Sequence, residues 1–247
     1  MVSDLSGRTA LVTGGARRIG RATSLALANA GANVIVHYNR SAAEAEELVE
    51  QIRDLGVQAW SVKAELGLPE ELESLIDRAH GLAGSLDILV NNASVFSESA
   101  FETFILDDLH ENININAWAP FVLAKRFVDL GTSGHIVNFL DTRVAGYDWS
   151  HVAYHASKSL LALFTRMMAL KFAPAFAVNA VAPGLILPPE GKDESYLEGL
   201  KDHLPLKRIG SPKDVTDAVL FLARSKFITG QVIFVDGGRH LREAIIG

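Results

Sequence analysis

The feature that most constrains the fold of this chain is a regular alternation of short apolar runs with longer segments of helical spacing. Most of the runs are almost continuously apolar, as expected of strands buried on both faces. Such alternation from one end to the other predicts a parallel β-sheet with helices packed on both faces. The predicted strands lie at 9–15, 33–39, 57–65, 86–94, 134–141, 176–184 and 231–238, and the predicted helices at 16–32, 41–56, 69–84, 108–131, 151–173 and 212–223.

No linker, repeat or low-complexity stretch interrupts this pattern. We therefore expect one α/β domain over 1–247, a single-domain Rossmann-type doubly wound parallel sheet with helices on both faces. The least regular stretch, about 185–205, holds two adjacent prolines, a glycine and several charges. We interpret it as a mobile substrate loop over a site, with a plain surface excursion as the alternative.

Composition excludes several kinds of function. A formal net charge of −6 argues against nucleic acid or an anionic membrane as the main partner. The absence of cysteine excludes disulfides, thiolate catalysis and cysteine-based metal sites. The chain shows neither the layout of a signal peptide nor an apolar run long enough for a membrane span. We expect a cytoplasmic protein that acts on a small molecule.

The first strand runs into a glycine-rich turn, "TGGARRIG", at 13–20. Glycines there let the backbone approach a phosphate at a helix N-terminus, which is where a dinucleotide pyrophosphate binds. The alternative is a tight turn that needs glycine only for its backbone angles. Position between the first strand and the first helix favours the dinucleotide site.

The end of the second strand indicates which dinucleotide the protein binds. NAD sites usually place an acid there, whereas this chain has His37, Tyr38, Asn39, Arg40 and Ser41. Together with the arginines of the glycine turn, Arg40 suits a 2′-phosphate, because a guanidinium donates two aligned hydrogen bonds. We therefore expect NADPH/NADP+ as the cofactor. Solvated surface arginines are the alternative.

Tyr154 and Lys158 are four residues apart on a predicted helix and so share one face. A nearby ammonium favours the phenolate and is expected to lower the pKa of the tyrosine, which eases proton exchange. An acid, Asp141, precedes the tyrosine by thirteen residues, at the end of a predicted strand.

Taken together, these motifs resemble the short-chain dehydrogenase/reductase family over essentially the whole chain. The likeness rests on the 13–20 turn, Asn-Asn-Ala at 91–93, Asn116, the Tyr154/Lys158 pair, Pro183-Gly184 and "ITGQVIFVDGG". The family implies an oxidoreductase, usually a homotetramer or dimer, that transfers hydride between a nicotinamide and a C=O or C=N bond. By position, Tyr154 would donate the proton, Lys158 would bind the nicotinamide ribose, and Asn116 would position a relay water.

The expected cofactor-binding residues follow from the turn, the second strand end and the resemblance. They are Gly14, Arg17, Arg18, Ile19, Gly20, His37, Tyr38, Asn39, Arg40, Ser41, Glu65, Leu66, Asn91, Asn92, Ala93, Ser94, Tyr154, Lys158, Pro183 and Gly184.

Three departures from the common family pattern point to one branch. Arg18 replaces the middle glycine of the turn, Ser94 replaces the glycine after Asn-Asn-Ala, and Asp141 replaces the catalytic serine. These departures resemble the pteridine reductase branch, which reduces biopterin and folate-type pterins with NADPH. The resemblance implies a substrate site of Arg18, Ser94, Phe96, Asp141 and Tyr154, with Phe96 stacked on the pterin ring.

The acid suits reduction of C=N, because the nitrogen anion formed by hydride addition must be protonated, and a carboxyl group can feed protons through Tyr154. Three alternatives stay open. Asp141 could merely cap the strand end, the enzyme could be a carbonyl or 3-oxoacyl-[acyl-carrier-protein] reductase, or the chain could bind NADPH without catalysis. His151 and His155 have the spacing of a helical metal pair, but no third ligand is evident and we expect no metal.

Overall fold

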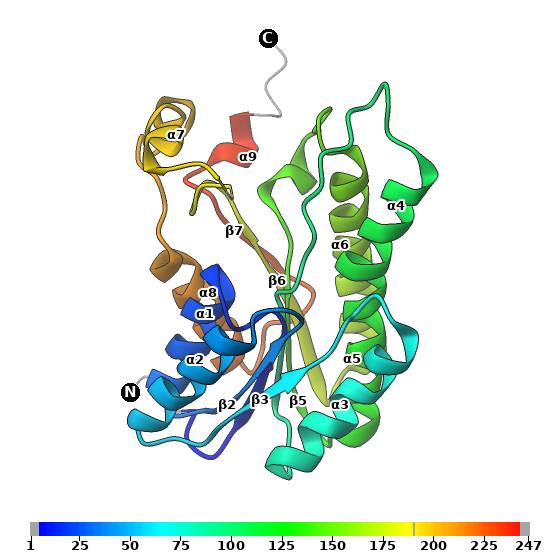
Figure 1. The fold of residues 1–247 in the computed structure, drawn as a ribbon, viewed down its shortest axis with the longest axis vertical. Helices are drawn as coiled ribbons and strands as arrows, with labels where there is room; N and C mark the ends of the chain where they lie inside the picture. The colour runs from blue at the N-terminus through cyan, green and yellow to red at the C-terminus, as the bar shows by residue number, and fades with distance from the viewer. Residues whose placement is uncertain (1–4, 190, 243–247) are drawn as a thin grey trace.

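The computed structural model describes residues 5–189 and 191–242. The predicted domain spans 1–247, so its two ends, and residue 190 of the predicted substrate loop, lie outside the described residues. Within them, a seven-stranded sheet has the order β3-β2-β1-β4-β5-β6-β7, with every pairing parallel (Figure 1). The strands are β1 (Thr9–Val12), β2 (Asn33–Tyr38), β3 (Ala59–Lys63), β4 (Ile88–Asn91), β5 (Gly134–Phe139), β6 (Phe176–Pro183) and β7 (Val232–Val235).

Helices cover both faces of this sheet, as the alternation predicts. In Figure 1, α1, α2 and α8 lie on one side of the sheet, and α3, α4, α5 and α6 lie on the other. The helices are α1 (Arg18–Asn29), α2 (Ala42–Asp54), α3 (Pro69–Ala83), α4 (Leu106–Ile113), α5 (Ala119–Leu130), α6 (Val152–Phe172), α7 (Glu194–Glu198), α8 (Pro212–Arg224) and α9 (Arg239–Arg242).

Two apolar layers hold the helices to the sheet, and alternate residues of one strand belong to different layers. Val34 and Val36 of β2 pack in the layer beneath α1, α2 and α8, whereas Ile35 packs in the layer beneath α3, α5 and α6. Successive side chains of a strand point to opposite faces, so a strand buried on both faces must be continuously apolar. The predicted fold class is confirmed.

The structure differs from the expected elements in three places. The predicted helix 108–131 consists of the end of α4, a π-helical turn at Asn114–Trp118, and α5. The predicted substrate loop contains α7, whose first turn is capped by the Asp193 carboxylate, and a 3₁₀ turn at Lys201–His203. The short helix α9 was not expected, because four residues carry too little periodicity to be recognised.

The carboxyl ends of parallel strands meet at one edge of the sheet, and this edge carries the candidate site. It is the upper edge in Figure 1, where α7 and α9 also lie. Within the described residues, no helix combines the length and the apolarity needed to cross a membrane.

Candidate active site

The glycine turn is fixed by hydrogen bonds from the end of β4. Asn92 donates from Nδ2 to the carbonyl oxygens of Thr13 (2.9 Å) and Gly14 (3.0 Å), and its backbone N–H donates to Thr13 Oγ1 (2.9 Å). A Cβ on Gly20 would collide with the Gly14 carbonyl and lie 2.6 Å from Asn92 Nδ2. The turn therefore requires glycine at position 20, because a side chain there would displace the Gly14 carbonyl or the Asn92 amide.

His37 connects this turn to two strands. Its Nδ1 accepts the Gly14 N–H (3.0 Å), so Nε2 carries the proton and donates to the Ala64 carbonyl (3.0 Å). Burial lowers the pKa of His37 to about 4, and the imidazole is therefore neutral at pH 7. The ring of His37 therefore holds the glycine turn in place.

Arg18 adopts a backbone conformation that explains why glycine is common at its position. Its φ is +53°, in the left-handed region that residues other than glycine, Asn and Asp rarely adopt. The guanidinium Nη2 donates to the carbonyl oxygen of Pro188 (2.6 Å), at the start of the predicted substrate loop. Arg18 thus joins the glycine turn to that loop.

A cavity of about 550 Å³ extends from the glycine turn across the ends of β2 and β3. Eleven of the predicted cofactor-binding residues line it: Gly14, Arg17, His37, Tyr38, Asn39, Arg40, Ser41, Glu65, Leu66, Ala93 and Ser94. The sequence did not single out the remaining lining residues, which are Ala16, Ala64, Gly67, Val95, Glu111 and Ile115. Small or apolar residues carry no chemical signal of their own, so only the fold brings most of them to the site.

The other predicted cofactor residues are not part of the lining of this cavity. Asn91 is buried in β4, where its Nδ2 donates to Asn138 Oδ1 (2.8 Å), and Ile19 packs against the core beneath α1. Pro183 ends β6 and Gly184 follows it, where a Cβ on Gly184 would lie 2.6 Å from the Cβ of Asp236. These residues shape the edge of the sheet.

The predicted catalytic residues come together at the ends of β5 and α6. Tyr154 Oη donates to Asp141 Oδ2 (3.1 Å), and Asp141 Oδ1 also accepts the Arg143 N–H (2.8 Å). Lys158 Nζ donates to the Phe139 carbonyl (2.8 Å) and lies 5.6 Å from the centre of the Tyr154 ring. The spacing of thirteen residues therefore places the acid in direct contact with the phenol.

The expected effect of Lys158 on Tyr154 is wrong for this structure. Burial, and then the charge and hydrogen bond of Asp141, raise the pKa of Tyr154 well above its ordinary value. Burial also lowers the pKa of Lys158 itself, to about 8. The expectation rests on the Lys158 ammonium, whereas the partly buried Asp141 carboxylate, which accepts a hydrogen bond from the phenol, acts in the opposite direction. Tyr154 is consequently protonated at neutral pH, as a proton donor must be.

Asn116 lies in the π-helical turn and connects three segments. Its Oδ1 accepts from Ser94 Oγ and from the Val95 N–H (both 2.9 Å), and its Nδ2 donates to Ser157 Oγ (3.0 Å) on α6. Single π-helical turns occur frequently at functional sites. Here the turn holds Ser94 beside the catalytic helix.

Phe96 lies against the catalytic tyrosine. Its ring meets Tyr154 edge to face (4.7 Å between centroids, 86°) and stacks on His151 (4.1 Å, 15°). The residue is 45% exposed, so part of the ring is accessible to a ligand. His151, considered from the sequence only as a metal ligand, instead supports this aromatic ring.

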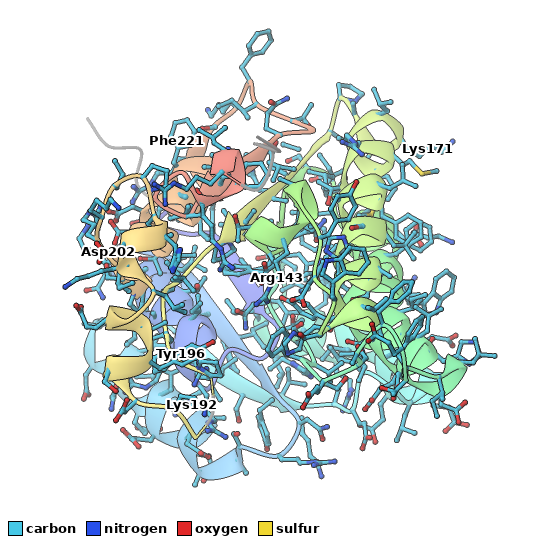
Figure 2. All side chains as sticks on the ribbon, turned by 90° about the horizontal axis from the view of Figure 1, so that it is seen from above. Arg143, Lys171, Lys192, Tyr196, Asp202 and Phe221 are labelled. Carbon is cyan, nitrogen blue, oxygen red and sulfur yellow. The ribbon has the colours of Figure 1, made fainter. Side chains whose placement is uncertain are left out.

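Two charged residues that the sequence did not single out complete the catalytic centre. Arg143 Nε contacts Asp148 Oδ2 (2.7 Å), and its Nη1 lies 3.7 Å from Asp141 Oδ2. Figure 2 shows Arg143 near the middle of this edge, with Lys192 and Tyr196 on the segment to one side. Among the described residues, no group of three or more His, Cys, Asp or Glu side chains could hold a metal ion.

Comparisons with known proteins agree with this geometry. A family model described as enoyl-(acyl carrier protein) reductase matches residues 14–240. FolM alternative dihydrofolate reductase 1 from Brucella canis, complexed with NADP, is 34% identical and superposes with a TM-score of 0.92 over 96% of this chain and 95% of that one. The angucycline C-6 ketoreductase LanV, with bound NADP, is 33% identical, with a TM-score of 0.90 over 97% and 98% of the two chains.

A third relative, the 3-oxoacyl-[acyl-carrier-protein] reductase FabG of Staphylococcus epidermidis, is 33% identical over 95% of this chain and 99% of its own. The fold and the site define a nicotinamide-dependent oxidoreductase. The chain belongs to the short-chain dehydrogenase/reductase family, as its motifs predict.

Proposed function

We propose that this oxidoreductase is an NADPH-dependent pteridine reductase, which reduces a C=N bond of a dihydropterin, biopterin or folate-type substrate. The observation that carries the proposal is the hydrogen bond from Tyr154 Oη to Asp141 Oδ2 (3.1 Å). A carboxylate at this position cannot donate a hydrogen bond to a carbonyl oxygen as a serine hydroxyl does. It is suited instead to exchanging a proton with the tyrosine.

The cavity fits the cofactor. It lies beside the glycine turn, and it is bordered by Arg17 and Arg40 with no acid at the end of β2. We assign the pyrophosphate to the start of α1 and the 2′-phosphate to these two arginines. When bound, NADPH supplies the hydride that adds to the carbon of the C=N bond.

Tyr154 would donate the proton that the substrate nitrogen requires, since its raised pKa keeps the phenol protonated near neutral pH. Asp141 is only partly buried and can therefore exchange protons with water and return one to the tyrosine. Lys158 lies beneath the tyrosine ring, where it can hold the nicotinamide ribose. Asn116 holds Ser94 beside this group.

The pterin itself would lie against the exposed part of Phe96. Flat aromatic rings stack favourably on a phenylalanine, and a sandwich between Phe96 and the nicotinamide would orient the reacting bond. The similarity to the FolM alternative dihydrofolate reductase from Brucella canis supports this choice. The same protein from Brucella suis, also in complex with NADP, is 35% identical, with a TM-score of 0.91.

The second candidate is a carbonyl or 3-oxoacyl-[acyl-carrier-protein] reductase. One observation favours it: Asp141 Oδ1 caps the following 3₁₀ turn, a structural role that is independent of any pterin. FabG and LanV support it as well. The least favoured candidate is an NADPH-binding protein without catalysis, because it leaves the contact between Asp141 and Tyr154 without a purpose.

The test is oxidation of NADPH, followed at its absorbance maximum, with a panel of substrates. The panel holds dihydrobiopterin, dihydromonapterin, dihydrofolate, simple ketones and a 3-oxoacyl thioester. We expect turnover with at least one of the pterins, and Tyr154→Phe should abolish it because the proton donor is removed. Turnover with carbonyl compounds alone would contradict the pterin assignment, and turnover with none of the panel would favour the binding protein.

A further inference from the structure

The catalytic tyrosine and five other side chains form a closed ring of contacts. Asp141 accepts from Tyr154, Tyr154 meets the edge of Phe96, and Phe96 stacks on His151. The ring is completed by a hydrogen bond between His151 and Asp148, an ion pair between Asp148 and Arg143, and the approach of Arg143 to Asp141. The proton-transfer pair and the aromatic wall are therefore parts of one assembly.

Asp148 links Arg143 and His151 within this ring of contacts. Its side chain is only 10% exposed, and its Oδ1 accepts the backbone N–H groups of Ser150 (2.8 Å) and His151 (3.0 Å). Its Oδ2 contacts both Arg143 Nε (2.7 Å) and His151 Nδ1 (3.2 Å). One buried carboxylate thus orients the two side chains that reach Asp141 and Phe96. Burial raises the pKa of Asp148, but the Ser150 N–H and the Arg143 and His151 charges outweigh this and lower it overall.

Arg143 acts on the acid. Its guanidinium is held by Asp148, and Nη1 lies 3.7 Å from Asp141 Oδ2, the oxygen that accepts the hydrogen bond from Tyr154. A fixed cation at this distance restricts the orientation of the carboxylate and offsets its charge. It also opposes the increase in the Tyr154 pKa that Asp141 causes.

His151 acts on the aromatic ring. Its imidazole covers one face of Phe96 at 4.1 Å, and the Arg143 guanidinium also lies over the ring, 5.3 Å from its centre. Phe96 is still 45% exposed. The Asp148 contact fixes the rotation of the imidazole. A ring that is supported from behind loses less conformational freedom when a flat substrate stacks on it.

We propose that Asp148, Arg143 and His151 are positioning residues of the reductase, with two separable effects: Arg143 orients Asp141 for proton transfer, and His151 orients Phe96 for substrate binding. This inference relies on the proposed function only for the choice of substrate. It applies to whichever substrate of the panel the unmodified enzyme reduces.

The test is steady-state kinetics of two single variants at saturating NADPH. Arg143→Met should lower kcat about tenfold or more, with KM changed by less than about threefold, because the methionine still contacts Phe96. His151→Ala should raise KM about fivefold or more, with kcat within about twofold, because Phe96 loses its support. A residue with a merely structural role would not divide its effects between kcat and KM in this way.

A double-mutant cycle identifies the side chain through which each residue acts. In an Asp141→Asn background, Arg143→Met should add less than about twofold to the loss of kcat, whereas His151→Ala should keep its full effect on KM. Arg143→Lys, which retains the charge, should recover part of kcat and replaces Arg143→Met if that variant does not fold. As a control, Arg126→Met removes an exposed arginine on α5 that contacts Asp77 (2.5 Å). This variant should change neither kcat nor KM.

If the losses of kcat caused by Arg143→Met and by Asp141→Asn multiply fully in the double variant, the proposal is wrong. It is also wrong if the variants lower the temperature of unfolding while kcat and KM stay the same, or if they change both constants equally. Failure of the pterin assignment is seen separately, because the unmodified enzyme would then reduce no pterin.

Discussion

Asp141 uses the two oxygens of one carboxylate for two purposes. Oδ1 caps the 3₁₀ turn that follows β5, and Oδ2 accepts the hydrogen bond donated by Tyr154 Oη. The sequence suggested these as competing interpretations, but both contacts exist together. The pair could be predicted because a strand end and a helix face fix where each residue points. The ring of contacts through Arg143 and Asp148 could not, because it depends on side-chain rotamers in an irregular segment.

We propose that Arg40 determines which of the two dinucleotides binds. It lies at the end of β2, on the border of the cofactor cavity, where an acid would hold the ribose of NADH. Arg40→Ala should raise the Kd for NADPH about tenfold or more and change that for NADH by less than about threefold, because only NADPH carries the 2′-phosphate. Fluorescence titration of the reduced cofactors measures both constants.

The control for this measurement is Arg126→Ala, which removes an exposed arginine on α5. It should leave both dissociation constants unchanged. Equal weakening of NADPH and NADH by Arg40→Ala would contradict the 2′-phosphate role.

Helices and strands were predicted where the periodic pattern of apolar residues extends over many positions, and were missed where it covers only a few. All seven strands and the longer helices follow from apolar runs and helical spacing, and their ends differ from the expected ones by a few residues. The π-helical turn that places Asn116 looks like ordinary helix in the sequence, because one inserted residue barely changes the pattern. The helix α7 depends on a local cap within an otherwise irregular segment.

The junction of β1, β2 and β3 contains a group that responds to pH. His37 is buried with a pKa of about 4, against 6.5 when exposed. Between these values the unfolded chain binds a proton that the folded chain does not, so stability is complete above pH 6.5 and decreases as the pH falls towards 4. At about 1.4 kcal/mol per pKa unit, this one side chain should remove about 3 kcal/mol of the free energy of unfolding.

Urea unfolding followed by circular dichroism at intervals between pH 7 and pH 4 measures this loss. The variant His37→Asn keeps an acceptor for the Gly14 N–H but does not titrate. It should be less stable than the natural chain at pH 7 and should lose markedly less stability as the pH falls. An identical slope in both proteins would show that His37 is not the responsible group.

At the scale of the whole molecule, the parallel sheet assembles the site from distant segments. The glycine turn follows β1, Phe96 follows β4 and Asp141 follows β5, and all of them meet at the carboxyl edge because every strand runs in the same direction. Topology is therefore what made most of the site predictable from sequence. The position of the start of the predicted substrate loop beside the glycine turn depends on specific contacts such as that of Arg18 with Pro188, which no periodicity encodes.

The central claim is that the acid beside Tyr154 adapts this fold to C=N rather than C=O reduction. Exchange of Asp141 for the serine common in the family tests it most directly, through kcat/KM for a dihydropterin and for a 3-oxoacyl thioester. Asp141→Ser should lower the value for the pterin about a hundredfold while the value for the thioester stays the same or rises, because a hydroxyl polarises a carbonyl but supplies protons poorly. An unchanged or increased kcat/KM for the pterin would contradict the account.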